Sequence, residues 1–440
     1  MQLTGEQIFA LAPDAGSAAN GKKLANSKHW RSVGQNEQAI WGECQGSALY
    51  QVRVDVTTLS VKCSCPSHKF PCKHGLGLLL LTTDGKSVPM AEPPDWVREW
   101  LAKRAETAEK KQARATEQPK PVDEAAQAKR AEKRATLVGH GLASLDLWMN
   151  DLIRNGLASV EAQPISFWER QAAQMVDAQA PGVAGRLRQL AGIPGSSADW
   201  PERLAGSLGR LALLTHAYSR LDTLDEPLRY DVRQNVGWTL SQDEVTAAGQ
   251  PISDEWLVVG QWVEDGDRVR TQRTWMIGAQ SRRPALLLSF SAMGAPFGDA
   301  PLVGMRQRAT LTYYPGAAPI RARLEQHVGE PVAITELSAG HETVEAFLAA
   351  VAATLARQPW TDRFLCVLRR ATPVCLDGGQ RWFLRDAEGD ALPLLAEEHW
   401  RLLALSGGQP VAVAGEWDGV TLRPLGVCCE DRYHPLGGVA

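Results

Sequence analysis

Four soft metal ligands lie within twelve positions near the N-terminus of this chain. Cys63 and Cys65 are separated by one residue, and Cys72 and His74 repeat that spacing after six intervening residues. Because residues i and i+2 of a strand point the same way, the first two thiolates can reach one ion from a strand end. Three thiolates and one imidazole complete a tetrahedral shell without water, which is typical of structural zinc. The spacing therefore predicts one structural Zn²⁺ held by these four side chains.

His68 lies between the two pairs and is the alternative fourth ligand. We prefer His74 because it repeats the i, i+2 spacing with Cys72 and opens a leucine-rich run that predicts a helix. Pro66 and Pro71 fix φ and stiffen the loop between the pairs. The segment thus predicts a small ββα-like module in which a strand, a loop and a helix fold around one zinc ion.

These residues resemble the SWIM zinc finger, whose pattern is C-x-C, a variable spacer and C-x-H. All four ligands match, and the resemblance extends upstream through Trp41–Ser47 and Tyr50–Asp55. It implies binding to DNA or to protein rather than an enzymatic activity. Some bacterial SWIM proteins of similar layout are associated with MoxR-type AAA ATPases and von Willebrand A domain proteins. The resemblance therefore also implies a protein partner of one of these kinds.

Catalytic constellations are not evident in the sequence. The chain lacks the glycine-rich phosphate and dinucleotide motifs, the H-E-x-x-H zinc motif and the G-x-S-x-G elbow. Cys44 has no identifiable base beside it, as a nucleophile would need. From residue 140 onward the histidines occur singly: His140, His216, His327, His341, His399 and His434. We therefore expect a non-enzymatic binding or adaptor protein.

Nucleic-acid binding is the alternative function. Lys62, Lys69, Lys73 and His68 of the finger loop could contact phosphates. The formal net charge of −3 and the pI near 6.3 give no global attraction to a polyanion, so such binding needs a local patch. We therefore favour a protein partner and keep DNA binding by the same finger as the alternative.

The cysteine content and the N-terminus predict a cytoplasmic protein. The remaining cysteines, which are Cys44, Cys366, Cys375, Cys428 and Cys429, are too few for a disulfide scaffold and are expected to be reduced thiols. Residues 1–6 lack a basic region, and the apolar stretch at 8–12 is too short for a secretory signal. No apolar run reaches the length of a membrane span, so we expect no membrane association.

The sequence predicts an α+β multidomain protein. With 440 residues and 44% hydrophobic content, the chain is long enough for two or three domains. The predicted regions are a zinc-finger module over 1–97, a charged helical linker over 98–135, an α-helical bundle over 136–225, and a β-rich half over 226–440 with one helix near 342–357.

Composition sets the linker boundaries. Residues 98–134 hold eleven Lys and Arg against seven Asp and Glu, with Pro119 and Pro121 between two helical stretches. The small positive excess would suit weak phosphate attraction, but a mixed-charge spacer explains it equally well, and we favour the spacer. Beyond it, leucine periodicity predicts helices up to 224. Alternating patterns then predict strands at 256–263, 268–277, 285–290, 308–314 and 319–324.

Overall fold

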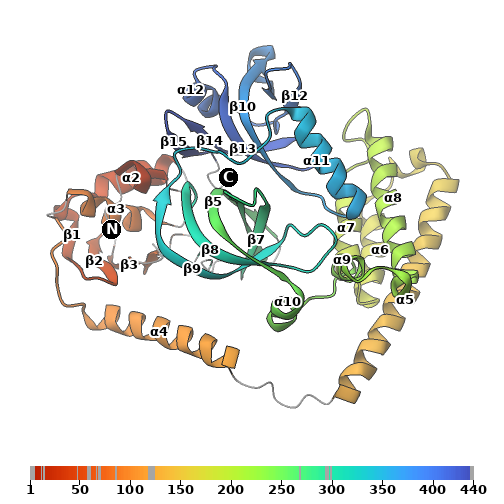
Figure 1. Cartoon of the computed structure of the whole chain (residues 1–440), viewed down its shortest axis with the longest axis horizontal. Coiled ribbons are helices and arrows are strands. Elements are labelled where there is room, and N and C mark those ends of the chain that lie inside the picture. Colours follow the sequence, from red (N-terminus) through yellow and green to blue (C-terminus); the bar gives the residue numbers. More distant parts are fainter. Residues whose placement is uncertain are drawn as a thin grey trace.

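The N-terminal domain is built on a four-stranded antiparallel sheet. The computed structural model describes residues 5–10, 12, 15–46, 48–56, 61–65, 67, 71–84, 87–116, 124–266, 269–292, 297 and 300–436. The sheet has the order β1-β2-β3-β4, and Figure 1 shows it at one side of the molecule. Its strands are β1 (Trp30–Gln35), β2 (Ala39–Gln45), β3 (Leu49–Asp55) and β4 (Val61–Cys63). The sequence predicted strands near β2 and β3 and missed β1, because only two of the six residues in β1 are buried.

Helices cover both faces of this sheet. On one face lies α3 (Lys73–Leu81), with α1 (Gly5–Ala10) and α2 (Ala15–Leu24) packed around it. The leucines of α3 join Val52 and Val54 of β3 in one core. The alternation of side chains along β3 directs these two valines toward α3 and directs Arg53 to the opposite face. This arrangement places the start of α3 next to the end of β4.

The opposite face is covered by the first turns of α4 (Asp95–Thr116). Trp100 is 7% exposed and packs with Trp41 and Val97. Arg104 forms a 3.0 Å ion pair with Asp55. Residues 98–104, which the sequence assigned to the linker, therefore lie against the finger sheet. The composition of this segment is polar, but Trp100 buries part of it.

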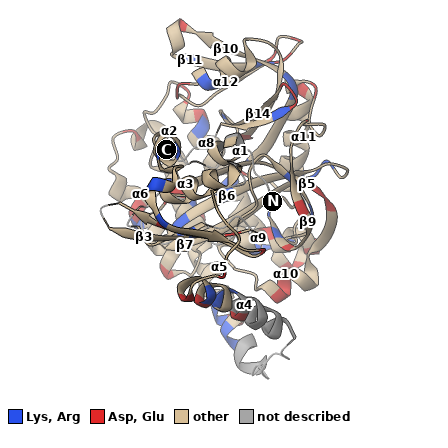
Figure 2. Ribbon diagram, turned by 90° about the vertical axis from the view of Figure 1, so that its left-hand side faces the viewer, with Lys and Arg blue, Asp and Glu red and all other residues tan. Residues whose placement is uncertain are grey.

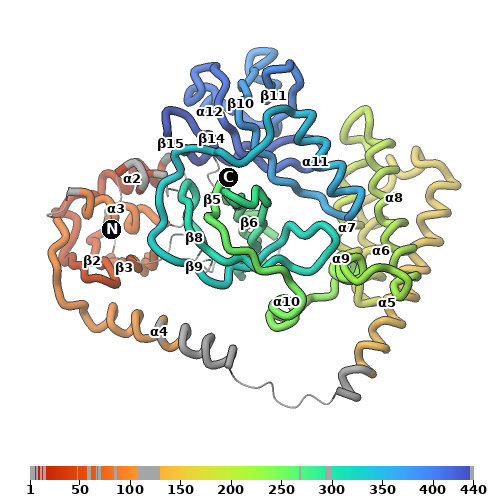
Figure 3. The backbone as a smooth tube through the Cα atoms, in the orientation of Figure 1, coloured from red at the N-terminus to blue at the C-terminus, as the bar shows by residue number. Residues whose placement is uncertain are grey.

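The helical bundle begins on a second long helix, α5 (Glu124–Arg154). It continues through α6 (Ile165–Asp177), α7 (Pro181–Leu190), α8 (Trp200–Ser219) and α9 (Glu226–Val236). The tube in Figure 3 shows the chain passing from the finger through α4 and α5 to this bundle. Arg134 of α5 donates a 3.1 Å hydrogen bond to the carbonyl of Gly237, so α5 contacts the bundle from before residue 136.

The helical region also extends past the predicted limit of residue 225. After α9 comes α10 (Gln242–Ala248), and the first β-strand of the C-terminal half begins only at Gln250. Gly237 ends α9 in the left-handed conformation, with φ of 117°. The sequence missed α9 because Val232 and Val236 are its only buried apolar residues, and these give a weak helical pattern.

The first C-terminal sheet has the order β7-β6-β5-β8-β9 and curls on itself. Its strands are β5 (Gln250–Asp265), β6 (Val269–Gly278), β7 (Pro284–Ala292), β8 (Met305–Tyr313) and β9 (Ala322–Ala333). The N–H of Leu286 donates a 2.9 Å hydrogen bond to the carbonyl of Ile320, just before β9. The two outer strands thus meet, and Trp256 and Tyr313 fill the enclosed core.

The second C-terminal sheet has the order β12-β11-β10-β13-β14-β15. Its strands are β10 (Phe364–Leu376), β11 (Arg381–Arg385), β12 (Ala391–Pro393), β13 (Val411–Trp417), β14 (Leu422–Cys429) and β15 (Arg432–Pro435). Two helices accompany it, α11 (Val344–Arg357) and α12 (Trp400–Ser406). The sequence predicted the first of these and missed α12, which has only seven residues. Leu257 and Trp275 of the curled sheet pack against Val367 and Leu425 of this one.

Trp360 joins the β-rich half to the bundle. Its side chain is 5% exposed and belongs to the core of the bundle. Its indole N–H donates a 3.0 Å hydrogen bond to the carbonyl of Arg210 on α8. Nearby, Asp231 of α9 accepts hydrogen bonds from the backbone N–H of Ala317 at 2.7 Å and the amide of Gln358 at 2.9 Å. The bundle and the β-sheets therefore share a buried junction.

The predicted α+β multidomain class is confirmed by this architecture. The N-terminal module is larger than a ββα unit, because β1 and β2 extend its sheet and α1 and α2 flank its helix. Within the described residues, no helix combines the length and the apolar composition that a membrane span requires.

Candidate metal centre

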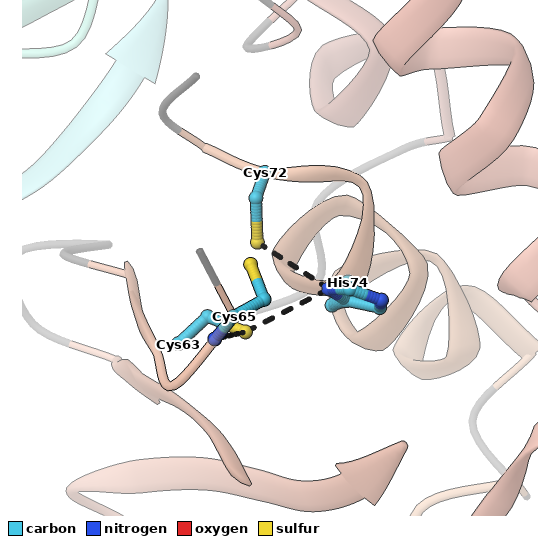
Figure 4. Close-up of side chains that lie close together, drawn as sticks. All are labelled: Cys63, Cys65, Cys72 and His74. Carbon is cyan, nitrogen blue, oxygen red and sulfur yellow. Dashed lines mark hydrogen bonds between the residues drawn. The ribbon is translucent and has the colours of Figure 1, made fainter. Parts of the chain in front are cut away.

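The end of β4 and the start of α3 bring the four predicted ligands together. Cys63 is the last residue of β4, and Cys65 follows it in the bend. Cys72 occupies the N-cap of α3 in an extended conformation, and His74 lies in the first turn of that helix. Figure 4 shows the four side chains converging between the loop and the helix.

The spacing of the ligand atoms fits one tetrahedral ion. The Nδ1 atom of His74 lies 3.8 Å from Sγ of Cys63 and 4.0 Å from Sγ of Cys72. All four ligand atoms, including Sγ of Cys65, lie within 4.8 Å of one another. Zinc–sulfur bonds of about 2.3 Å and zinc–nitrogen bonds of about 2.0 Å separate tetrahedral ligands by roughly 3.5–3.8 Å. The cluster therefore matches a zinc shell once the most distant ligand atoms move closer by up to about 1 Å.

The ligand set also fits zinc chemically. Three thiolates and one imidazole fill four positions, and no carboxylate takes part among the described residues. Thiolate and imidazole are the ligands that structural zinc sites use, and a filled shell has no position for a reacting water. The cluster forms one Cys₃His site suited to a single structural Zn²⁺.

A hydrogen bond between the Cys63 and Cys72 thiols shifts their pKa values in opposite directions. The pKa of the Cys72 thiol is lowered to about 4, first because the Cys63 thiol donates a hydrogen bond to it, and further by contact with His74 and the N–H of Gly75. The same bond raises the pKa of Cys63 well above its usual range, and burial adds to that rise. The N–H of Cys65 lies 3.5 Å from Sγ of Cys63 and donates to it. A divalent cation replaces the shared proton and lets all three sulfurs act as thiolates.

Two neighbouring residues hold the histidine and the helix in place. The ring of Tyr50 on β3 lies 4.8 Å from the ring of His74, tilted by 35°. A Cβ atom at Gly75 would lie 2.4 Å from Cγ1 of Val61, so only glycine lets α3 approach β4 this closely. Neither role was predicted from the spacing of the ligands. The role of Gly75 could have been predicted, because a glycine weakens a helix and this one directly follows a ligand histidine.

Cys44 is close to the ligands but belongs to the core. Its side chain is fully buried among the apolar residues under α3. Burial raises the pKa of its thiol to about 11. A protonated, inaccessible thiol is a poor nucleophile and a poor metal ligand. This position agrees with the expectation of a reduced thiol that is not a nucleophile.

Two of the lysines that were candidate phosphate contacts lie on opposite faces of the finger sheet. Lys62 pairs with Arg53 across β3 and β4, and Arg53 lies over Trp96 on the face covered by α4. Lys73 begins α3 on the other face. Lys69 and His68 lie outside the described residues. Lys62 and Lys73 therefore do not form one patch, and the choice between His68 and His74 depends here on the position of His74 alone.

Two segments of the chain match models of known protein families. Residues 50–82, which contain all four ligands, match the SWIM zinc finger, and residues 133–236 match the SWIM-associated four-helix bundle domain. The second segment covers most of α5 and all of α6 to α9. No curated protein and no solved structure matches the chain. The finger is thus similar to a SWIM zinc finger in sequence and has the Cys₃His geometry of a zinc site.

Proposed function

We propose that this protein is a non-enzymatic adaptor of the reducing cytoplasm, in which a zinc-ordered finger presents a surface to a protein partner. The observation that carries the proposal is the closed Cys₃His set, whose ligand atoms lie within 4.8 Å of one another. Such a shell has no position for water or substrate, so its metal stabilises structure. None of the eight cysteines forms a disulfide, which suits a reducing compartment.

The metal orders the helix on which the finger surface depends. Cys72 and His74 hold the first turn of α3, and α1 and α2 pack on the rest of that helix. Loss of the metal would release this turn and with it the placement of α2. Partner binding by the finger should therefore require zinc.

A catalytic role for the thiol nearest the site has little physical support. Cys44 is fully buried and its pKa is raised to about 11, so the thiolate needed for nucleophilic attack is scarce at neutral pH. This favours binding over catalysis for the finger.

The partner class that we propose is a MoxR-type AAA ATPase or a von Willebrand A domain protein. This choice rests on the resemblance in layout to bacterial SWIM proteins. Nucleic acid is the alternative partner, and the placement of Lys62 and Lys73 on opposite faces weighs against it.

The test is affinity capture of the intact tagged protein from its native cytoplasm, with the captured proteins identified by mass spectrometry. A Cys65→Ser variant removes one zinc ligand, and a Cys429→Ser variant serves as the matched thiol control. We expect an ATPase or von Willebrand A protein to be captured by the native chain and the control and lost with Cys65→Ser. Equal capture by all three chains would contradict a role for the finger. Capture that nuclease treatment abolishes would favour the nucleic-acid alternative.

A further inference from the structure

One segment of the finger domain is basic, and a carboxylate lies beside its end, because Glu43 of β2 accepts a 3.1 Å hydrogen bond from Ser32 of β1. Residues 15–35 contain four Lys and Arg and no Asp or Glu. This segment comprises α2, the short 3₁₀ helix Ser27–His29 and the strand β1. Its basic side chains are all exposed, and they are Lys22, Lys23, Lys28, His29 and Arg31.

A compact turn fixes the position of these side chains. The indole N–H of Trp30 donates a 2.8 Å hydrogen bond to the carbonyl of Leu24 at the end of α2. Asn26 caps the 3₁₀ helix by accepting a 3.0 Å hydrogen bond from the N–H of Lys28. Trp30 itself is 8% exposed and anchors the turn in the core. The basic residues on either side of Trp30 are therefore held by packed structure.

Close packing of α2 on α3 brings a further lysine beside them. A Cβ atom at Gly21 would lie 2.7 Å from Cβ of Leu76 and 3.5 Å from the carbonyl oxygen of Lys73. One at Gly77 would lie 2.8 Å from Cβ of Leu24. The last turn of α2, which carries Lys22 and Lys23, thus lies next to the zinc-held first turn of α3, where Lys73 is exposed. We call Lys22, Lys23, Lys28, His29 and Lys73 the basic face.

The side chains of the basic face have no ion-pair partner in the part of the chain that the structure describes. Exposed arginines elsewhere differ, because Arg98, Arg188 and Arg381 each pair with a neighbouring carboxylate. Unpaired cations gathered on one rigid surface produce a local positive potential that attracts an anionic partner.

We propose that the basic face is the docking surface for an acidic segment of a protein partner, an inference that rests on the proposed adaptor function and names the chemistry of its partner. The size of the positive region favours a short peptide over nucleic acid. Residues 1–97 hold nine Lys and Arg against eight Asp and Glu, and the exposed Glu92 and Asp95 lie at the α4 side of the domain.

The range of electrostatic interactions separates the two kinds of partner. At physiological ionic strength charges interact over about 8 Å, so a short acidic segment meets only the basic face. A nucleic acid extends further and also meets the acidic side. Figure 2 shows Lys and Arg positions interspersed with Asp and Glu positions along the ribbon of the described residues.

The experiment measures binding of a fluorescein-labelled octaglutamate peptide to the full chain by fluorescence anisotropy, at low and physiological ionic strength. A Lys22→Glu/Lys23→Glu variant reverses two charges of the basic face. Lys129→Glu/Lys133→Glu reverses two exposed charges on α5 and is the matched control for net charge. Octaglutamine tests whether the peptide binds without its charge. A short DNA duplex tests whether the same surface binds nucleic acid. Zinc content and circular dichroism check that each variant is folded.

We expect saturable octaglutamate binding that weakens with salt, is reduced by about tenfold or more in Lys22→Glu/Lys23→Glu and is unchanged in the control. Absence of saturable binding at low ionic strength would overturn the inference, as would equal loss in both variants or equal binding of octaglutamine. If the duplex binds more tightly than the peptide and this binding is lost in the same variant, the ligand of the basic face is nucleic acid and not an acidic peptide. The adaptor function is tested separately by zinc-dependent capture, so either proposal can fail alone.

Discussion

Trp275 donates a 2.6 Å hydrogen bond from its indole N–H to the carboxylate of Glu416, across the interface between the two C-terminal sheets. The indole of Trp262 donates to the same oxygen at 3.0 Å. Glu416 is 2% exposed, and the guanidinium of Arg363 lies 3.7 Å from its other oxygen. The buried carboxylate of Glu416 thus accepts hydrogen bonds from the buried Trp275 and the half-buried Trp262. A second buried polar contact joins the sheets, because the Tyr433 hydroxyl donates to the carbonyl of Val259.

Replacing Glu416 should separate the hydrogen-bonding role from the role of charge. Glu416→Ala leaves two indole N–H groups without an acceptor and should lower the free energy of unfolding by about 2–5 kcal/mol. Glu416→Gln keeps an acceptor oxygen and should cost less. Urea unfolding followed by tryptophan fluorescence measures both, with Glu264→Ala, at an exposed acidic position on β5, as the control. Equal losses for Ala and Gln would show that the charge alone matters.

Removal of a zinc ligand should unfold the finger. Binding free energies of about 10–16 kcal/mol are typical of structural zinc in small domains, and this energy is available only to the folded site. Cys65→Ser and His74→Ala should lose the metal in native mass spectrometry, whereas His68→Ala should keep one zinc per chain. A full zinc equivalent in Cys65→Ser would refute the ligand assignment, and loss of zinc from His68→Ala would make His68 the fourth ligand.

Truncating Trp360 should uncouple the bundle from the sheets. The side chain fills the bundle core, and Trp→Ala changes at such sites cost about 3–5 kcal/mol. We expect the bundle and the sheets of the native chain to unfold in one shared transition, and those of Trp360→Ala to unfold in two separate transitions. Trp400→Ala removes a tryptophan that is 48% exposed and should leave the profile unchanged. A single transition at the native temperature in Trp360→Ala would disprove the coupling.

Asp231 should make the junction between the bundle and the sheets sensitive to pH. Burial raises the pKa of this carboxyl to about 6 from an ordinary value of 3.8, and Arg357 and the N–H of Ala317 oppose the rise. A carboxyl with a raised pKa binds more protons when folded, so its contribution to stability is largest below pH 4 and is lost as pH rises through 6. The loss amounts to at most about 3 kcal/mol.

Comparison of urea unfolding at pH 5 and pH 7 tests this prediction. The native chain should lose more stability between these values than Asp231→Asn, whose side chain does not titrate. Asp222→Asn, at an exposed position in the short 3₁₀ helix between α8 and α9, is the matched control and should follow the native chain. A slope in Asp231→Asn equal to the native one would show that another group titrates.

The zinc site could be predicted from sequence because its ligands are local. Cys63 to His74 span one strand end, one loop and one helix start, so spacing alone indicates their convergence. Helix α9 was missed because its two buried valines give too weak a period. The closure between Leu286 and Ile320 and the docking of Trp360 on Arg210 join residues far apart in the chain. Such contacts arise from tertiary packing, which the local pattern does not encode.

Both ends of the linker are anchored, and this affects how readily a partner can bind the finger and the bundle at the same time. Arg104 is bound to Asp55 of the finger, and Arg134 is bound to Gly237 at the bundle. A partner that has contacted the finger therefore meets the bundle at a local concentration set by the short stretch between these anchors. In helical segments each residue adds only about 1.5 Å of reach. Insertions or deletions there should change avidity for a partner that spans both regions, while the affinity of each region alone stays the same.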